Sequence, residues 1–372
     1  MSKITKYALS DLYDMSSGLS SKKEQAGHGA PFVSFGTVFN NYFLPEELPD
    51  LMDTNEKEQQ IYSIKTGDVL ITRTSETIDE LAMSCVAVKD YPKATYSGFT
   101  KRLRPKREGI AYPKYMAFYF RSALFRKAVT NNAFMTLRAS FNEDIFTFLD
   151  VYLPDYDEQV RIGDMLYNIE CKIQKNKEIN DYLEQLLCLL YENMMNDAQT
   201  GNITGHNTIA SALTNIVTGK EDANFSSPNG KYNFFTCSSN TLKCDEYAFN
   251  ASSILIAGNG EFNVKHYTGK FNAYQRTYVL IPDLEYYGLL YLASMYQIKS
   301  FKSAASGSIV KFITKGDIEN IPVFIPDNKA ILNKFNCLLM LQEQYQKESD
   351  ELASIRDWLL PMLMNGQAAI ED

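Results

Sequence analysis

One set of residues has the types and spacing of a metal-dependent nuclease site. Pro154-Asp155 is followed by Glu170-Cys171-Lys172, which fits a spaced PD and ExK pattern. That chemistry requires both carboxylates to meet at one metal ion, normally on neighbouring strands. Glu170 and Lys172 instead lie within a regular helical repeat. We therefore interpret the pattern as a coincidence.

Other catalytic and metal-binding patterns are not found in the sequence. The chain has no Pro-Pro dipeptide, which an amino-methyltransferase motif requires, and the glycines at 258 and 260 lack the spacing of a nucleotide-binding loop. Neither Gly-Lys pair, at 219 or at 269, has the context of a P-loop. Six cysteines form no CxxC pair, and only three histidines are present, so a zinc site or a histidine-dependent triad is not expected. We expect this chain to have no catalytic residues, metal or cofactor.

The charge is unevenly distributed along the chain. A net charge of −8 argues at first against a nucleic-acid partner. The acidity, however, lies in residues 156–202, with a net charge of −5, and in 327–372, with −4. Residues 1–155 are neutral and 203–326 carry +1, so nucleic acid remains a candidate partner of these two segments.

Two basic stretches stand out within these segments. Residues 89–140 hold twelve basic residues against two acidic ones, and 265–315 hold seven against two. Basic side chains neutralise phosphates, and Arg, Lys, Asn and Gln also hydrogen-bond base edges in the major groove. The predicted DNA-binding residues are Arg73, Ser75, Lys101, Arg102, Arg104 and Arg138 in the first segment and Asn259, Lys265, Gln275, Arg276, Ser306, Ser308 and Lys311 in the second.

The elements that position these residues occur twice. ALSDLYDMSSG from Ala8 is matched by ALTNIVTGK from Ala212, GDVLITRTS from Gly67 by SSILIAGNG from Ser252, and the DVYLPD that ends at Asp155 by PVFIPD. The shared order indicates a tandem duplication of a domain of about 120 to 150 residues. Short apolar runs bounded by Gly, Asp and Pro predict strands, and residues 113–129 and 286–301 have helical spacing, so each copy is a mixed α and β domain. A solvated charged face explains one basic stretch alone, but two at corresponding places favour DNA.

A heptad repeat follows each copy. The apolar positions predicted to form the interface between the helices are Ile162, Leu166, Ile169, Ile173, Leu183, Leu187, Leu190, Phe335, Leu338, Leu352 and Leu359. The centre of both repeats is polar. Antiparallel pairing would place Asn176 and Asn180 near Gln342 and Ser349, which satisfies buried polar groups.

The predicted fold class is α+β, with two tandem mixed α/β domains separated by two long helices that form an antiparallel coiled coil. The predicted boundaries are 1–155 for domain 1, 156–202 for the first helix, 203–326 for domain 2 and 327–372 for the second helix and tail. Helices of this length are roughly 50 to 60 Å long. The first should end between Asn196 and Gly201, and the second at Asn365-Gly366 after a disturbance at Pro361.

The sequence does not predict export or membrane insertion. It opens without a signal-peptide pattern, and no window approaches the roughly 18 to 20 apolar residues of a spanning helix. We expect a cytoplasmic protein with free thiols.

The sequence resembles the specificity (S) subunits of type I restriction-modification enzymes. The resemblance covers essentially the whole chain and rests on GDVLITRTS at 67–75, LPDYDEQVRIGDML at 153–166, GKFNAYQRTYVL at 269–280 and RDWLLPMLMNGQ at 356–367. It implies two target-recognition domains, each reading half of a split asymmetric site. It also implies helices that dock two methyltransferase (M) subunits carrying S-adenosylmethionine, with restriction/translocase (R) subunits joining for cleavage. One departure is that Pro326-Asp327-Asn328-Lys329 stands where the family usually repeats a Glu-Gln pair, which leaves the start of the second helix open.

Three alternatives remain open from the sequence. The chain could be the specificity subunit of a related system whose partner both methylates and cuts. It could be a coiled-coil scaffold that does not bind DNA. The alternative that the sequence favours least is a self-contained nuclease.

Overall fold

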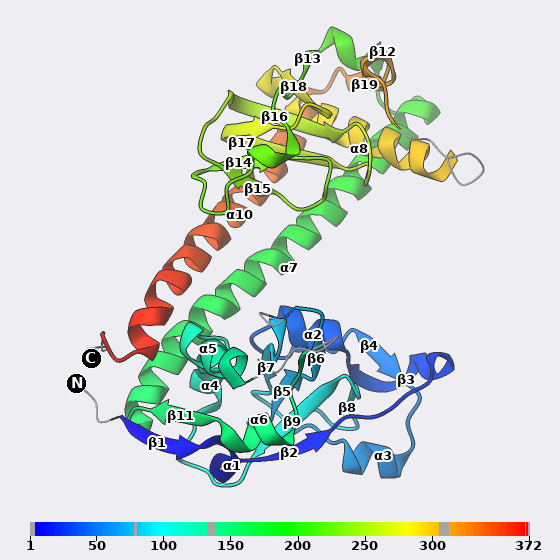
Figure 1. Ribbon diagram of the computed structural model, residues 1–372. Helices are drawn as coiled ribbons and strands as arrows, with labels where there is room; N and C mark the ends of the chain where they lie inside the picture. Colours follow the sequence, from blue (N-terminus) through cyan, green and yellow to red (C-terminus); the bar gives the residue numbers. More distant parts are fainter. Residues whose placement is uncertain (1–3, 78–79, 133–138, 305–311, 369, 371–372) are drawn as a thin grey trace. The chain divides into compact units, whose positions relative to one another are not determined.

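The protein is described from a computed structural model that covers residues 4–77, 80–132, 139–304, 312–368 and 370. The chain forms two compact units. Unit 1 is Met1–Gln174 with Asp350–Asp372, and unit 2 is Lys175–Ser349. The two long helices, α7 (Tyr156–Thr200) and α10 (Lys329–Met364), each contribute to both units (Figure 1).

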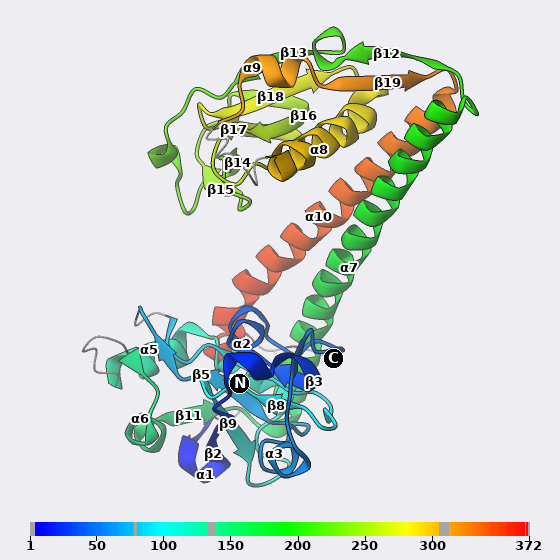
Figure 2. The ribbon, with the colours of Figure 1, turned by 90° about the vertical axis from the view of Figure 1, so that its right-hand side faces the viewer.

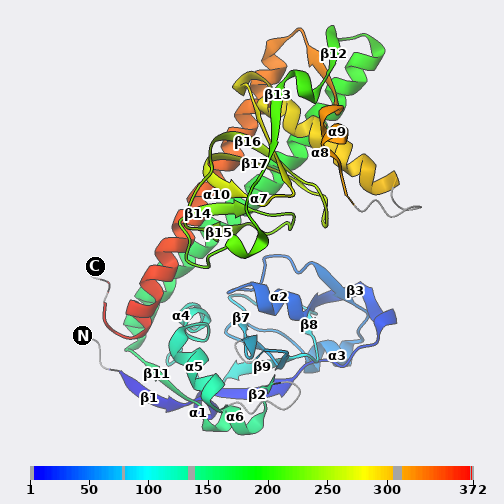
Figure 3. The same cartoon turned by 45° about the horizontal axis from the view of Figure 1, so that its top comes forward.

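Unit 1 is a mixed α and β domain. Its strands form an antiparallel sheet in the order β2-β9-β5-β7, a smaller sheet in the order β4-β3-β8, and the pairs β1-β11 and β6-β10. Helix α4 packs on β7 (Figure 3), and its residues from Tyr115 to Tyr119 are buried together with Val69, Ile71 and Leu103 of the sheet. The strands are β1 (Thr5–Ala8), β2 (Tyr13–Ser17), β3 (Ala26–Val33), β4 (Asp50–Met52), β5 (Val69–Thr72), β6 (Thr74–Ser75), β7 (Ser84–Val86), β8 (Thr95–Tyr96), β9 (Thr100–Pro105), β10 (Ala139–Ser140) and β11 (Asp150–Leu153), and the short helices are α1 (Leu9–Leu12), α2 (Phe35–Asn40), α3 (Glu56–Ile61), α4 (Pro113–Tyr119), α5 (Ala123–Asn132) and α6 (Glu143–Phe148).

Unit 2 is built around one six-stranded sheet in the order β13-β18-β16-β17-β14-β15, with the pair β12-β19 beside it. Helix α8 packs on β16 and β17 (Figure 2), and the buried residues Leu289, Leu290 and Leu292 of this helix meet Ile254 and Ile256 of β16. The elements are β12 (Gly205–Ile209), β13 (Thr214–Thr218), β14 (Tyr232–Phe235), β15 (Leu242–Cys244), β16 (Phe249–Ala257), β17 (Val264–Ala273), β18 (Thr277–Pro282), α8 (Tyr287–Ala304), α9 (Lys315–Glu319) and β19 (Pro322–Pro326).

The two units have the same strand order, which confirms the predicted duplication. β2, β9, β5, β3 and β4 of unit 1 correspond to β13, β18, β16, β14 and β15 of unit 2, and β3 and β14 each make a parallel pairing within their sheet. The difference is one strand. β17 is continuous in unit 2, whereas unit 1 divides its counterpart into β7 and β8 and therefore has two sheets in place of one.

The long helices form the predicted antiparallel coiled coil. In unit 2 the Asn176 amide donates to the Glu348 carboxylate at 2.8 Å, and the Asn180 amide donates to the carbonyl oxygen of Gln342 at 3.3 Å. Gln342 donates in return to the carbonyl oxygen of Asn180 at 3.1 Å. The polar centre is therefore confirmed for these residues, but the Ser349 hydroxyl donates within its own helix to the carbonyl oxygen of Tyr345.

The predicted seam residues are buried or half-buried throughout. Ile162 and Leu166 belong to the core of unit 1, with Leu359 against it, and Leu187 and Phe335 belong to the core of unit 2, with Leu190 and Leu338 against it. Ile169, Ile173, Leu183 and Leu352 are half-buried. Both predicted helix ends are confirmed: α7 ends at Thr200 and α10 continues through Pro361 to Met364, and each is followed by a glycine at positive φ, Gly201 or Gly366. In the described part of the chain, no helix is long and apolar enough to cross a membrane.

Candidate functional site

Three of the predicted residues meet at one end of the main sheet of unit 1. Arg73 directly follows β5, where its N–H donates to the carbonyl oxygen of Phe99 at 2.8 Å. Lys101 lies on β9 opposite Ile71 of β5, and Ser75 lies on β6. We call Arg73, Ser75, Phe99 and Lys101 site A.

Site A holds two neighbouring cations. The Arg73 side chain is exposed, and Lys101 is half-buried with its Nζ donating to the Ser17 hydroxyl at 2.9 Å. Burial, and then the positive charge of Arg73, lower the pKa of Lys101. Because two close cations repel each other, a bound anion would stabilise this arrangement.

Unit 2 has the same backbone arrangement at the corresponding place. Gly258 follows β16 as Arg73 follows β5, and its N–H donates to the carbonyl oxygen of Arg276 at 2.9 Å. The carbonyl oxygens of Arg73 and Gly258 each accept a hydrogen bond of 2.8 Å, from the N–H of Phe141 and of Ile313 respectively. We call Asn259, Gln275 and Arg276, which surround this point, site B.

Both sites depend on a glycine that follows the first strand of the sheet. A Cβ on Gly18 would lie 2.1 Å from the carbonyl oxygen of Ser97, and one on Gly219 would lie 2.0 Å from that of Ala273. The N–H groups of the two glycines donate to Thr100 and Thr277, the first residues of β9 and β18. The two units therefore build the sites on the same local framework.

The side chains of the two sites differ. Arg276 is exposed, and Asn259 is half-buried beside it. The Gln275 amide donates to the Asp222 carboxylate at 2.7 Å, so it is held within the domain. Phe99 of site A, which is 66% exposed, is replaced at the equivalent position of site B by Arg276.

Comparison with known proteins gives the family of this fold. The family model described as "Type I restriction modification DNA specificity domain" matches residues 1–185 and 211–346. The chain belongs to this family. The two matched segments fall on the two copies of the duplicated domain.

Two known proteins that are similar to this chain are also specificity subunits. The type I restriction enzyme EcoDI specificity subunit of Escherichia coli is 39% identical over 166 residues, which are 43% of this chain and 37% of that protein. The crystal structure of a type I restriction-modification system S subunit from M. genitalium matches with a TM-score of 0.64 at 17% identity and covers 97% of this chain and 96% of that one. The structural match shows that the two proteins share a fold.

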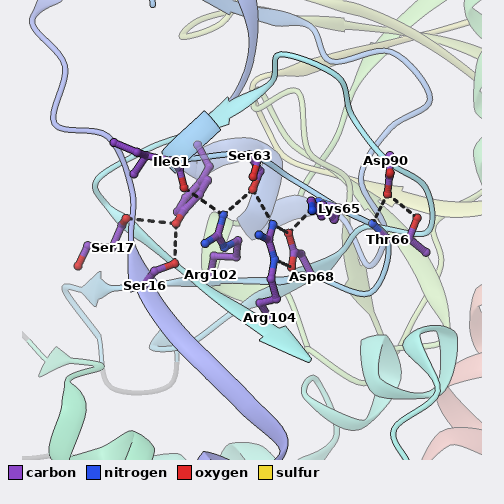
Figure 4. A network of polar contacts seen from close by, with 11 residues as sticks. Ser16, Ser17, Ile61, Ser63, Lys65, Thr66, Asp68, Asp90, Arg102 and Arg104 are labelled. Carbon is purple, nitrogen blue, oxygen red and sulfur yellow. Dashed lines mark hydrogen bonds and ion pairs between the residues drawn. The ribbon is translucent and has the colours of Figure 1, made fainter. Parts of the chain in front are cut away.

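Two predicted site residues of the specificity-domain protein are engaged inside unit 1. Arg104 makes a bidentate pair with the buried Asp68, at 2.8 and 2.6 Å, and donates to the carbonyl oxygen of Ser63 (Figure 4). Arg102 is 8% exposed and donates to the same carbonyl oxygen. Strand alternation explains this, since Arg102 and Arg104 point to the opposite face of β9 from Lys101. The placement favours a structural role for both.

Much of the basic stretch at 89–140 is likewise used within the domain. Arg121 is a clear case, because its guanidinium donates to the carbonyl oxygens of Val38, Phe39 and Asn41 at the end of α2. Burial lowers the pKa of Arg121. Further side-chain contacts join Lys89 to Glu46, Lys106 to Asp14 and Lys114 to Asp164. The density of basic residues in the sequence therefore overstates the charge available for phosphates.

The remaining predicted residues of the second unit have mixed positions. Lys265 lies on β17, where its Nζ donates to the carbonyl oxygen of Ser238 and burial lowers its pKa. Its amine is therefore already engaged within the sheet region. Arg138, Ser306, Ser308 and Lys311 lie outside the described residues.

The residues of the nuclease pattern are not brought together. Asp155 directly precedes α7, whereas Glu170 lies fifteen residues along it, roughly 22 Å at the rise of a helix. The Glu170 carboxylate instead pairs with Arg356 at 2.6 Å. Among the residues that the structure describes, no group of three or more His, Cys, Asp and Glu is placed to hold a metal ion.

The Glu-Gln pair at the start of α7 has a structural explanation. Gln159 is 1% exposed, accepts a hydrogen bond of 2.9 Å from the N–H of Tyr112 just before α4, and donates to the carbonyl oxygens of Ile110 and Pro154. In unit 2, Asn336 of α10 makes the corresponding contact with the N–H of Gly288 at 2.7 Å. The second helix begins at Lys329, with Asn328 capping its first turn, although it lacks the Glu-Gln pair.

Sequence reasoning missed two aromatic residues beside site A. Phe35 and Phe39 of α2 have stacked rings, with centroids 5.8 Å apart, and both are half-buried. With Phe99 they line a hollow. Their spacing of four residues, which places both rings on one face of a helix, was the available signal.

Proposed function

We propose that this specificity-domain protein is the DNA-reading subunit of a type I restriction-modification complex. Unit 1 reads one half of a bipartite asymmetric DNA site through site A, and unit 2 reads the other half through site B. The paired helices set the spacing of the half-sites and dock two methyltransferase subunits. Those subunits carry S-adenosylmethionine and, with restriction/translocase subunits, perform the chemistry.

The observation that carries this proposal is the recurrence of one framework with different side chains. Sites A and B share the same backbone hydrogen bonds and the same close-approach glycine, yet one presents Phe99 where the other presents Arg276. A duplicated scaffold that binds one class of partner would keep its framework. Different exposed side chains on that framework suit two different base sequences.

The charges of the two sites suit the DNA backbone and base edges. Arg73 and Lys101 supply neighbouring cations for phosphate, and Arg276 and Asn259 can each make bidentate contacts in the major groove. Arg102 and Arg104 are not part of this proposal, because their guanidinium groups are engaged with Ser63 and Asp68.

An exposed apolar stripe supports partner docking on the helices. Tyr182, Leu186 and Leu189 of α7 are 68%, 39% and 54% exposed and follow one another at steps of four and three residues. Neighbouring apolar side chains on one exposed helix face are typical of a surface that binds another protein. We assign this face of unit 2 to a methyltransferase subunit.

The test is to sequence methylated adenines in DNA modified by the chain together with its methyltransferase partner. A split asymmetric motif that requires this chain supports the proposal. No motif from an assembled complex that holds active cofactor would favour the scaffold alternative.

Variants assign the halves of the motif. Arg73→Ala should weaken recognition of one half-site, and Arg276→Ala should weaken the other. If both variants affected the same half, the assignment of one half to each unit would be wrong. Inserting seven residues into α7 should lengthen the unread spacer, and an unchanged spacer would refute the ruler function.

A further inference from the structure

A hollow of about 390 Å³ opens beside site A. Its apolar walls are Phe35, Phe39 and Phe99, and its polar lining is Thr74, Ser75, Glu76 and Glu80. α2 packs against β5 and β7, and Figure 1 shows it beside β6, which carries Thr74 and Ser75. The volume lies within the range of pockets that bind small molecules.

The hollow has three kinds of chemistry close together. The phenylalanine rings offer flat faces for stacking, and the Glu80 carboxylate is a group that can accept hydrogen bonds. Arg73, next to Thr74 in the chain and bonded through its N–H to Phe99, offers a cation at the rim, with Lys101 near it. A flat ring, an amino group and a phosphate are together the features of a nucleotide.

We propose that this hollow binds one nucleobase that has been extruded from the DNA duplex and bears an exocyclic amino group: adenine, cytosine or guanine. The proposal rests on the proposed function and assigns a further specificity site to unit 1. The base stacks on Phe99, Glu80 accepts a hydrogen bond from its amino group, and Arg73 and Lys101 contact the adjoining phosphate.

The carboxylates decide which bases fit. An ionised carboxylate only accepts hydrogen bonds, so it pairs with the exocyclic amino group of adenine, cytosine or guanine, whereas thymine has no amino group to offer. The Ser75 hydroxyl donates to the Glu80 carboxylate at 3.4 Å, which helps to orient that carboxylate toward the hollow.

Unit 2 differs at the equivalent positions. β14 ends at Phe235 as β3 ends at Val33, and the residues that follow it are Thr236, Cys237 and Ser238 in place of Ser34, Phe35 and Gly36. Arg276 takes the place of Phe99. The site is therefore assigned to unit 1.

The first experiment measures the unpairing of the base. The affinity of the complex of the chain with its methyltransferase subunits is measured for duplexes that carry the recognised motif. An abasic nucleotide is placed in turn opposite each adenine, cytosine and guanine of the unit 1 half-site. Extrusion costs less where the pairing partner is missing, so affinity should rise at least about fivefold at one position. The Phe99→Ala variant should lose this gain.

The control is Phe148→Ala, which removes another phenylalanine of unit 1 that is 75% exposed and does not line the hollow. It should keep the gain. A gain that arises from the methyltransferase would be the same in the wild type and in Phe99→Ala. If the complex binds its motif specifically but no position has a gain that depends on Phe99, the extruded-base site is refuted while the proposed function stands. If no motif is bound at all, both fail.

The second experiment changes the base preference. Glu80→Gln keeps the shape of the side chain but adds donors, so thymine should become acceptable at the position found above. Sequencing of methylated DNA should show that selectivity for the amino-bearing base over thymine falls about tenfold or more there and nowhere else. Glu108→Gln, an exposed carboxylate outside the hollow, is the control. Unchanged selectivity in Glu80→Gln would overturn the role of the carboxylate.

Discussion

The ion pair between Glu170 and Arg356 gives a sharp test of how the helices are joined in unit 1. The two side chains are 8% and 14% exposed, and the guanidinium Nη1 lies 2.6 Å from the carboxylate. Arg356 also lies over the ring of Tyr42, 5.0 Å from its centroid, and contacts the more exposed carboxylate of Asp357 at 2.9 Å. Replacing Glu170 with Gln would therefore leave a buried guanidinium with one exposed anionic partner.

The expected loss follows from this burial. Removing one partner of a buried ion pair costs about 3–5 kcal/mol, and the remaining contact with Asp357 reduces the cost here to about 2–4 kcal/mol. For a unit of this size, that corresponds to a fall of about 5–15 °C in the midpoint of thermal unfolding. Circular dichroism and calorimetry on the full chain would resolve such a shift.

The control uses an exposed pair of the same unit. Glu46 pairs with Lys89 at 2.6 Å, but its side chain is 87% exposed, so Glu46→Gln should cost less than about 1 kcal/mol. The double variant Glu170→Leu with Arg356→Leu should recover most of the loss, because it leaves no buried charge. If Glu170→Gln were no more destabilising than Glu46→Gln, the reasoning from burial would be wrong.

Three further predictions concern the stability of the two units. Gly18→Ala should lower the free energy of unfolding of unit 1, measured by urea denaturation, by about 1–3 kcal/mol, because its Cβ would collide with a backbone oxygen. Gly36→Ala has no such close neighbour and should leave the stability unchanged. The double variant Asn180→Leu with Gln342→Leu should raise the free energy of unfolding of unit 2 by about 1–2 kcal/mol. The reason is that both side-chain amide oxygens are buried without a hydrogen-bond partner among the described residues. A lower free energy of unfolding would contradict this. Burial raises the pKa of Glu343, but hydrogen bonds from a histidine and a tyrosine outweigh this effect, so the net pKa lies below the ordinary 4.5. Unit 2 should therefore lose stability as the pH falls below about 4.5. Urea unfolding midpoints of the Glu343→Gln variant should depend less on pH than those of the wild type.

The repeat and the helices could be predicted from the sequence because local patterns encode them. Heptad spacing fixed the seam from Ile162 to Met194, and the matched motifs gave the duplication before any strand was placed. Seam residues at the helix ends, such as Ile162 and Phe335, also belong to the cores of the units. The spacing alone could not show this, since it does not say which domain packs against a helix.

The site was harder to predict because charge density does not reveal partners. Lys101 and Arg102 are neighbours in the sequence, yet one reaches site A and the other is held by the carbonyl oxygen of Ser63. Alternation along a strand predicts that they diverge. Which face is already occupied depends on Ser63 and Asp68, which only the fold brings there.

The buried Gln159 side chain also fixes how the domain of unit 1 is rotated about the axis of α7. Because this buried side chain holds the start of α4, and Gly163 has no room for a Cβ beside Tyr115, the domain and the first turns of α7 form one piece. Each residue added further along α7 would advance the helical phase by about 100°, and seven residues would return it to within about 20°. If the helices space the half-sites as proposed above, the length of this helix sets a direction as well as a distance.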